Sequence, residues 1–151
     1  MRREGKYEII IFDSAPHATE ATKNIAEVSD LVVLPVGTSK DDLDPQIDLA
    51  LELVDKAKIN PKKIAFVLSR VESKSTSIDE AREYLTRTRI SFHVFAHPLK
   101  ESRGCEVALN QGYSLTETTY PPLNENATSV AQEIFEYFNL MITNTQEAAS
   151  V

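Results

Sequence analysis

Several residue types that mark special classes of protein are scarce in this chain. Its 151 residues include one cysteine, so no internal disulfide can form. No apolar run approaches the roughly 20 residues that a membrane-spanning helix needs, and no small-residue cleavage site follows the basic start of the chain. Since 42% of the residues are hydrophobic, we expect a globular, cytoplasmic protein with no membrane segment.

Glycine is also scarce, and its placement excludes one common kind of nucleotide site. A phosphate-binding loop needs closely spaced glycines that lead into Gly-Lys-Ser or Gly-Lys-Thr. The four glycines are scattered, and they are Gly5, Gly37, Gly104 and Gly112. None of them opens such a motif, so the sequence lacks a phosphate-binding loop.

The balance of charge opposes tight, sequence-independent DNA binding by the surface as a whole. Such binding rests on neutralising phosphates, whereas this chain has a formal net charge of -7. Three cations, Arg82, Arg87 and Arg89, fall near the end of one predicted helix. The helix dipole favours cations there, so we interpret them as a solvated face.

Short apolar runs alternate with longer stretches of helical period, which is typical of βαβ units and a parallel sheet. We predict strands over residues 7–12, 31–36, 64–68 and 90–95. We predict helices over residues 18–28, 43–57, 77–88, 102–110 and 125–141, the third of which begins in the capping box Ser77-Ile78-Asp79-Glu80. The expected fold is one α/β domain over residues 1–142, with helices on both faces of a mostly parallel sheet in three layers. A frayed tail over residues 143–151 is expected to follow it.

The end of the first predicted strand carries the first candidate site residues. Ligands of an open parallel sheet bind at the carboxyl ends of its strands, and Asp13 directly follows the apolar run 9–12. An aspartate in that place is suited to hold magnesium, directly or through water. The alternative is that Asp13 or Ser14 caps the helix entered near Ala18.

Other reactive residues favour plainer interpretations. Asp13, Ser14 and His17 do not form a nucleophilic triad, because Ser14 lacks the Gly-x-Ser-x-Gly turn that exposes such a serine. The three histidines lack metal-ligand spacing, and we expect the single Cys105 to be a packing residue.

Three segments in the first third of the chain resemble the ParA/MinD family of partition ATPases. The run Ile9-Ile10-Ile11-Phe12-Asp13-Ser14-Ala15-Pro16 is similar to the Walker B and switch II segment of that family, which runs into Asp-Thr-Pro-Pro. Val28 to Val36 resembles its Ala-Asp-strand-Pro segment, and Asp42-Leu43-Asp44 matches the Asp-Leu that opens the family's next helix.

Two later segments continue the resemblance in the same order. Phe66 to Arg70 is similar to a family strand that ends in Asn-Arg near the adenine base, although Ser69 here replaces the asparagine. His97-Pro98 and residues 101–117 resemble the family's loop, short helix, glycine and closing segment. The resemblance therefore extends over roughly residues 7–140.

The resemblance implies a P-loop NTPase-like fold, truncated at its amino-terminal side, and a role in DNA segregation or positioning. It implies ATP and Mg²⁺ as cofactors of a complete family member, with magnesium at Asp13. The implied nucleotide-binding residues are Asp13, Ser14, Ala15, Pro16, Ser69, Arg70 and Pro98. The implied partners are a second copy in a dimer and a ParB-like centromere-binding protein, with non-specific DNA binding only in the complete protein.

The missing phosphate loop separates this chain from a complete family member. We expect no ATP hydrolysis by this polypeptide alone, whether it is a fragment of a complete ATPase or a natural truncated relative. The alternative is a non-catalytic interaction or dimerisation module derived from the same fold. Because unpaired strand edges and uncovered apolar surface favour association, we also predict that the chain self-associates.

Overall fold

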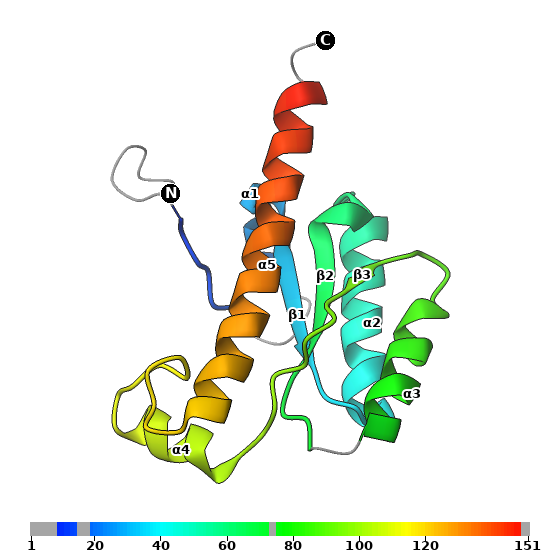
Figure 1. The fold of residues 1–151 in the computed structure, drawn as a ribbon. Helices are drawn as coiled ribbons and strands as arrows, with labels where there is room; N and C mark the ends of the chain where they lie inside the picture. The colour runs from blue at the N-terminus through cyan, green and yellow to red at the C-terminus, as the bar shows by residue number, and fades with distance from the viewer. Residues whose placement is uncertain (1–8, 15–18, 73–74, 149–151) are drawn as a thin grey trace.

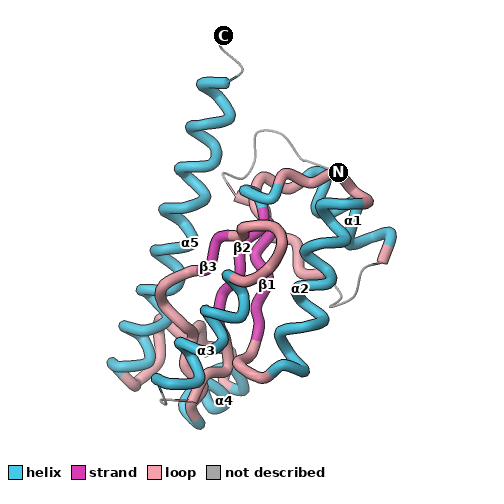
Figure 2. Tube along the Cα trace, turned by 90° about the vertical axis from the view of Figure 1, so that its right-hand side faces the viewer, coloured by secondary structure: helices cyan, strands magenta, loops and turns pink. Residues whose placement is uncertain are grey.

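The computed structural model describes residues 9–14, 19–72 and 75–148, and it is a three-layer α/β structure (Figure 1). The strands are β1 (Val32–Val36), β2 (Ile64–Leu68) and β3 (His93–Val94), and they form a parallel sheet in the order β1-β2-β3. The helices are α1 (Glu20–Val28), α2 (Lys40–Asp55), α3 (Ser75–Thr86), α4 (Arg103–Asn110) and α5 (Pro121–Ala148), with one 3-10 turn at Pro61–Lys63. Figure 2 shows α5 on one side of the sheet and α1 and α2 on the other.

The central strand β2 organises both layers of the core. All five of its residues are buried, as expected for a strand covered on both faces. Because side chains alternate along a strand, Ile64, Phe66 and Leu68 pack with α1, α2 and α3, whereas Ala65 and Val67 pack with Phe95 and Val130. The continuous apolar run in the sequence thus builds two cores, one on each face.

The structure confirms some of the predicted strands and changes or contradicts others. The strand predicted over 64–68 is confirmed, and the one over 31–36 differs from β1 by one residue. The strand predicted over 90–95 is shortened to two residues, because only His93 and Val94 pair with β2. The prediction over 7–12 is wrong for residues 9–12, which have no regular structure and are exposed; residues 7 and 8 lie outside the described part.

The helices confirm the predicted order, but most of their boundaries differ from the predicted ones. α3 begins at Ser75, so the capping box proposed at Ser77 is wrong, since Ser77 lies inside the helix. α1 has Thr19 as its N-cap, which accepts a hydrogen bond from the Thr22 amide at 3.2 Å, so Asp13 and Ser14 do not cap it. α5 continues to Ala148, which makes the predicted fraying wrong over 143–148.

One edge of the sheet is open among the described residues. β1 pairs only with β2 in the sheet, and the Val36 carbonyl accepts a hydrogen bond from the Ser69 amide at 2.8 Å. In a parallel ladder alternate residues bond to the same neighbour, so Val32, Leu34 and Val36 bond toward β2. The backbone groups of Val33 and Pro35 face away from β2, and a proline without an N–H group is tolerated at such a position.

Within the described residues, none of the helices has both the length and the apolar character needed to cross a membrane.

Candidate functional site

A hollow of about 270 Å³ lies at the carboxyl end of β1 and β2. The loops that follow these strands and the first turn of α2 line it; the lining residues are Gly37, Thr38, Ser39, Asp42, Arg70 and Glu101. Parallel α/β sheets bind their ligands at this edge. The hollow is therefore the best-placed candidate site in the described part of the chain.

The floor of the hollow is fixed by the start of α2. Ser39 donates a hydrogen bond from its hydroxyl to Oδ2 of Asp42 at 2.7 Å, and it accepts one from the Asp42 amide at 3.2 Å. Gly37 is packed so closely that an added Cβ would lie 2.3 Å from Oδ2 of Asp42. A larger residue here would push the Asp42 carboxylate away from Ser39, so Gly37 helps to set the shape of this side of the site.

Arg70 forms the opposite wall. Its backbone is left-handed, with φ of 53°, a conformation that is uncommon for residues other than glycine and worth attention near a site. The turn carries the guanidinium back over the sheet edge, where Nη2 lies 3.5 Å from Oδ1 of Asp42. Because both side chains are largely exposed, this ion pair orients Arg70 more than it stabilises the fold.

The loop that follows β3 leads to Glu101, which lines the hollow, and this loop is held by α5. The amides of Ala96 and His97 donate to the Glu133 carboxylate at 2.6 and 2.8 Å. Further along, Nδ2 of Asn126 donates to the Pro98 carbonyl at 3.0 Å, and the Lys100 amide donates to Oδ1 of Asn126 at 2.9 Å. The loop that carries Pro98 is thus held on both sides of the proline by side chains of α5.

Arg82 of α3, on the face of the sheet opposite α5, also binds this loop. Its guanidinium donates to the Phe95 carbonyl at 2.8 Å and also to the Ala96 carbonyl. The backbone amides of Ala96 and His97 are therefore bound by α5, and the backbone carbonyls of Phe95 and Ala96 are bound by α3. This arrangement places the backbone after β3 rigidly even though β3 itself is short.

The carboxylate of Glu133 accepts several of the hydrogen bonds that hold this loop. Burial raises its pKa, but the hydrogen bonds from the Ala96 and His97 amides and from the His97 ring outweigh burial, so the pKa of Glu133 lies below its usual value. The ring nitrogen Nδ1 of His97 lies 2.9 Å from Oε2 of Glu133. We infer that Glu133 is a positioning residue for the loop, since it does not line the hollow.

His93 gives the fold a pH dependence that can be measured. Its ring stacks on Tyr137 with centroids 4.0 Å apart, and burial lowers the pKa of His93, although nearby Glu133 opposes the shift. A group whose pKa is lowered in the fold contributes stability above its ordinary pKa and loses it as pH falls. We expect the melting temperature to drop as pH falls below 6.5, the ordinary pKa, toward the lowered pKa of His93 in the fold. In His93→Phe this drop should be smaller; equal drops in both proteins would contradict the prediction.

The charges of the hollow limit what it can hold. Two carboxylates, Asp42 and Glu101, and one guanidinium, Arg70, line it. This balance opposes a polyphosphate but suits a neutral, hydrogen-bonding group such as a nucleobase. Among the described residues, no group of three or more His, Cys, Asp or Glu side chains is arranged to hold a metal ion.

The structure brings together part of the predicted site. Arg70 lines the hollow, Ser69 precedes it at the end of β2, and the Pro98 loop pairs with β2 through the bond from the Leu99 amide to the Leu68 carbonyl at 2.8 Å. Asp13 and Ser14 are exposed on a segment outside the sheet, and neither lines the hollow. Ala15 and Pro16 lie outside the described residues.

Sequence reasoning missed the residues that hold the site in shape. Glu133, Asn126 and Arg82 are charged or amide side chains, which on a helix usually face solvent. Their partners are backbone groups far along the chain, and no spacing in the sequence marks such a contact. Gly37 carried a usable signal, because it follows a buried strand at the edge where ligands bind.

A second hollow, of about 540 Å³, lies between α2 and α3 and away from the strand ends. Asp44 accepts a hydrogen bond from the Tyr84 hydroxyl across it at 2.7 Å, and this bond raises the pKa of Tyr84. Because an existing contact between the two helices already uses these groups, we assign this hollow to helix packing.

Comparisons with known proteins add no relative to this description. No protein-family model, curated protein or solved structure matches the chain. The likeness to the ParA/MinD family therefore rests on the motifs in the sequence.

Proposed function

We propose that this chain provides the base-binding side of a nucleotide site of the ParA/MinD type, in a partition or positioning ATPase. The observation that supports the proposal best is the hollow at the carboxyl edge, which Arg70 and Glu101 line, with the Pro98 loop leading into Glu101. The sequence motifs that resemble the family's base-side segments are the ones that lie at this edge. ATP and Mg²⁺ would be the cofactors of the complete site, and a ParB-like protein and DNA would be its partners.

The phosphate side of the reaction lies beyond what this chain can perform. Its sequence contains no Gly-Lys-Ser or Gly-Lys-Thr motif, and Asp13 is an exposed residue outside the sheet. In the proposed function, Asp13 would approach magnesium only after the segment 9–14 joins a sheet. Ser69 and Arg70 would contact the base and its ribose, and the Pro98 loop would position Glu101 at the other side of the hollow.

The proposal predicts that adenosine stabilises the chain almost as well as Mg-ATP does. A ligand that binds only the folded state raises the melting temperature, and the acidic hollow gives triphosphate no advantage over the nucleoside. For a dissociation constant near 1 mM, 10 mM ligand should raise the melting temperature by about 3–6 °C. Scanning fluorimetry or calorimetry with adenosine, Mg-ATP and cytidine would measure the shifts.

Matched variants decide whether such a shift comes from the proposed site. Arg70→Ala should abolish it, because Arg70 forms one wall of the hollow. Arg87→Ala removes an exposed arginine that pairs with Glu83 on α3 and should leave it unchanged. A shift that survives Arg70→Ala, or the absence of any shift with adenosine, would overturn base binding at this hollow. A rise that requires magnesium and disappears in Asp13→Ala would place residual metal binding at Asp13.

The second candidate is a non-catalytic interaction module of the same fold. The observation that favours it is the acidic lining of the hollow, where Asp42 and Glu101 outnumber Arg70. Such a hollow suits a basic or amide-bearing partner segment better than a nucleotide. Stable association of the chain with itself and no response to adenosine or ATP would favour this candidate.

A further inference from the structure

We propose that residues 9–12 are a strap that closes onto the outer edge of β1 in the same chain, as an added parallel strand. The structure shows the strap open, since residues 9–12 belong to no strand. Three features of the described residues carry the proposal: an unpaired strand edge, an exposed apolar segment that runs parallel to it, and a connection with the helix of a parallel crossover. The proposal concerns a change within the fold and does not depend on the nucleotide site.

The outer edge of β1 offers backbone groups that are unpaired within the described part of the chain. The Val36 carbonyl accepts the Ser69 amide on the β2 side, and alternate residues of a parallel strand bond to the same neighbour. The amide and carbonyl of Val33 and the carbonyl of Pro35 therefore point away from β2. Such groups are a template for another strand, in which Val33 can donate and accept, whereas Pro35 can only accept.

The strap is the segment Ile9-Ile10-Ile11-Phe12. Its residues are β-branched or aromatic, the types that are enriched in strands. Ile9, Ile10 and Phe12 are between 41% and 43% exposed, and Ile11 is 89% exposed. Four consecutive exposed apolar residues are unusual on the surface of a globular protein. Pairing with β1 would remove part of this surface from water, and that gain favours the closed strap.

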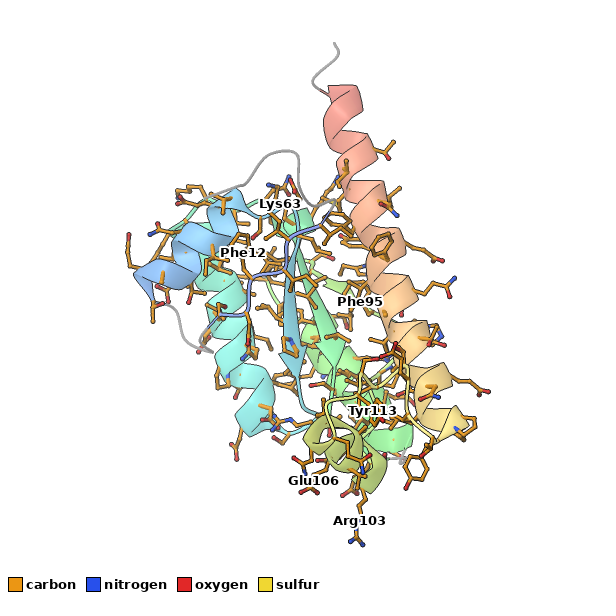
Figure 3. All side chains as sticks on the ribbon, turned by 90° about the vertical axis from the view of Figure 1, so that its left-hand side faces the viewer. Phe12, Lys63, Phe95, Arg103, Glu106 and Tyr113 are labelled. Carbon is orange, nitrogen blue, oxygen red and sulfur yellow. The ribbon has the colours of Figure 1, made fainter. Side chains whose placement is uncertain are left out.

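The strap lies on the side of the sheet that it would join and points in the required direction. Figures 1 and 3 show residues 9–12 on the side of β1 away from β2, running in the same direction as β1, and Figure 3 labels Phe12. Closing therefore needs a sideways displacement and no reversal of the chain. The strap of this chain can thus form a parallel ladder with β1.

The connection from the strap to β1 has the length and the helix of a parallel crossover. Parallel neighbours need a connection of about a dozen residues or more, usually with a helix, and residues 13–31 include α1. Ala26 of α1 belongs to the same core cluster as Leu53 of α2 and Leu85 of α3, so these three helices share one face of the sheet. The order strap-β1-β2-β3 would then repeat one crossover three times with the same hand, as parallel sheets require.

This covalent connection favours the strap of the same chain over that of a second copy. A short tether gives the strap an effective concentration of about millimolar order at the edge. Pairing within the chain should therefore prevail when the protein is micromolar. The closed state is expected in a monomer, and its population should not depend on protein concentration.

Closing would also change the charge of the candidate site, a consequence that rests on the hollow being the binding site. Asp13 follows the strap directly, and the carboxyl ends of parallel strands meet at one edge of the sheet. Asp13 would thus move toward the edge where Asp42 and Glu101 line the hollow. The position of the strap would regulate how acidic this edge is, and a closed strap would favour cationic or hydrogen-bond-donating groups there.

Hydrogen exchange at the Val33 amide in the full chain tests the proposal. We expect this amide to be protected equally at micromolar and millimolar protein. Ile11→Lys should speed its exchange by at least ~10-fold, because a charged side chain replaces one that the closed strap buries. Ile11 is so exposed in the open structure that the variant should fold normally, which circular dichroism would verify. The matched control is Leu109→Lys on α4, a residue that is 62% exposed and should leave the exchange of Val33 unchanged.

Three results would overturn the proposal. If Val33 exchanges like an unprotected amide while the amide of Phe66 on β2 stays protected, the edge remains open. Equal protection of Val33 in the unaltered chain and in Ile11→Lys would mean that another element covers the edge. Protection that appears only as concentration rises, together with a dimer in light scattering, would assign the edge to a second copy.

Discussion

Replacing Phe66 with alanine is expected to lower the free energy of unfolding by about 3–5 kcal/mol. Phe66 is fully buried, at 0% exposure, in the middle of the central strand. Its ring meets that of Phe92 edge to face with centroids 5.6 Å apart, an arrangement that adds to the effect of burial. The cavity cannot collapse easily, because β2 is fixed by ladders on both sides.

Urea denaturation followed by circular dichroism would measure this loss. Phe135→Ala is the matched control, because it removes the same side chain from an exposed position on α5, where 49% of the residue is in water. Its cost should stay below about 1 kcal/mol. A similar cost for the two variants would contradict the assignment of β2 to the centre of the core.

Glu133→Gln is expected to lower the free energy of unfolding by about 1–3 kcal/mol. The carboxylate accepts the amides of Ala96 and His97 with its two oxygens. A glutamine offers one oxygen and one NH₂ group, so one of the two backbone amides loses its acceptor and faces another donor. Glu136→Gln, one turn further along α5 and exposed, should change stability by less than about 0.5 kcal/mol.

Glu133→Gln should also change how the free energy of unfolding depends on pH in the acidic range. The pKa of Glu133 is lowered in the fold, so its contribution is fully present above its ordinary pKa of 4.5 and is lost as pH falls below that value. In Glu133→Gln the loss of stability below pH 4.5 should be less steep. Hydrogen exchange would add a direct readout, with the Ala96 and His97 amides exchanging faster in the variant; unchanged rates would mean that the clamp does not hold the loop.

The sequence predicted well where one local signal was sufficient. The run Ile64–Leu68 follows the Asn60-Pro61 breaker, and it is β2, residue for residue. At the same breaker, Asn60 caps the short turn by accepting the Lys62 amide at 3.0 Å. Gly112, with φ of 78°, follows the C-cap of α4 near the predicted helix end. Apolar continuity and turn chemistry are properties of a few neighbouring residues, so they can be read from the chain directly.

The predictions from sequence were wrong where pairing with a neighbouring strand decides whether a segment becomes a strand. Residues 9–12 have strong strand propensity, but a strand exists only if a neighbour supplies hydrogen bonds, and β1 does not pair with them. Residues 90–95 form only the short β3, since only His93 and Val94 pair with β2. The extension of α5 beyond residue 142 likewise has no sequence signal in its small and polar residues.

The sequence by itself determined the α/β class, the order of the helices and the buried central strand, because hydrophobic period and breakers act over a few residues. It also placed Ser69, Arg70 and Pro98 after the strands that form the site edge. Only the tertiary structure decided that Arg70 turns back onto Asp42 and that α3 and α5 clamp the Pro98 loop. Those contacts join residues between 13 and 37 positions apart, and their energy depends on a packing geometry that no local pattern encodes.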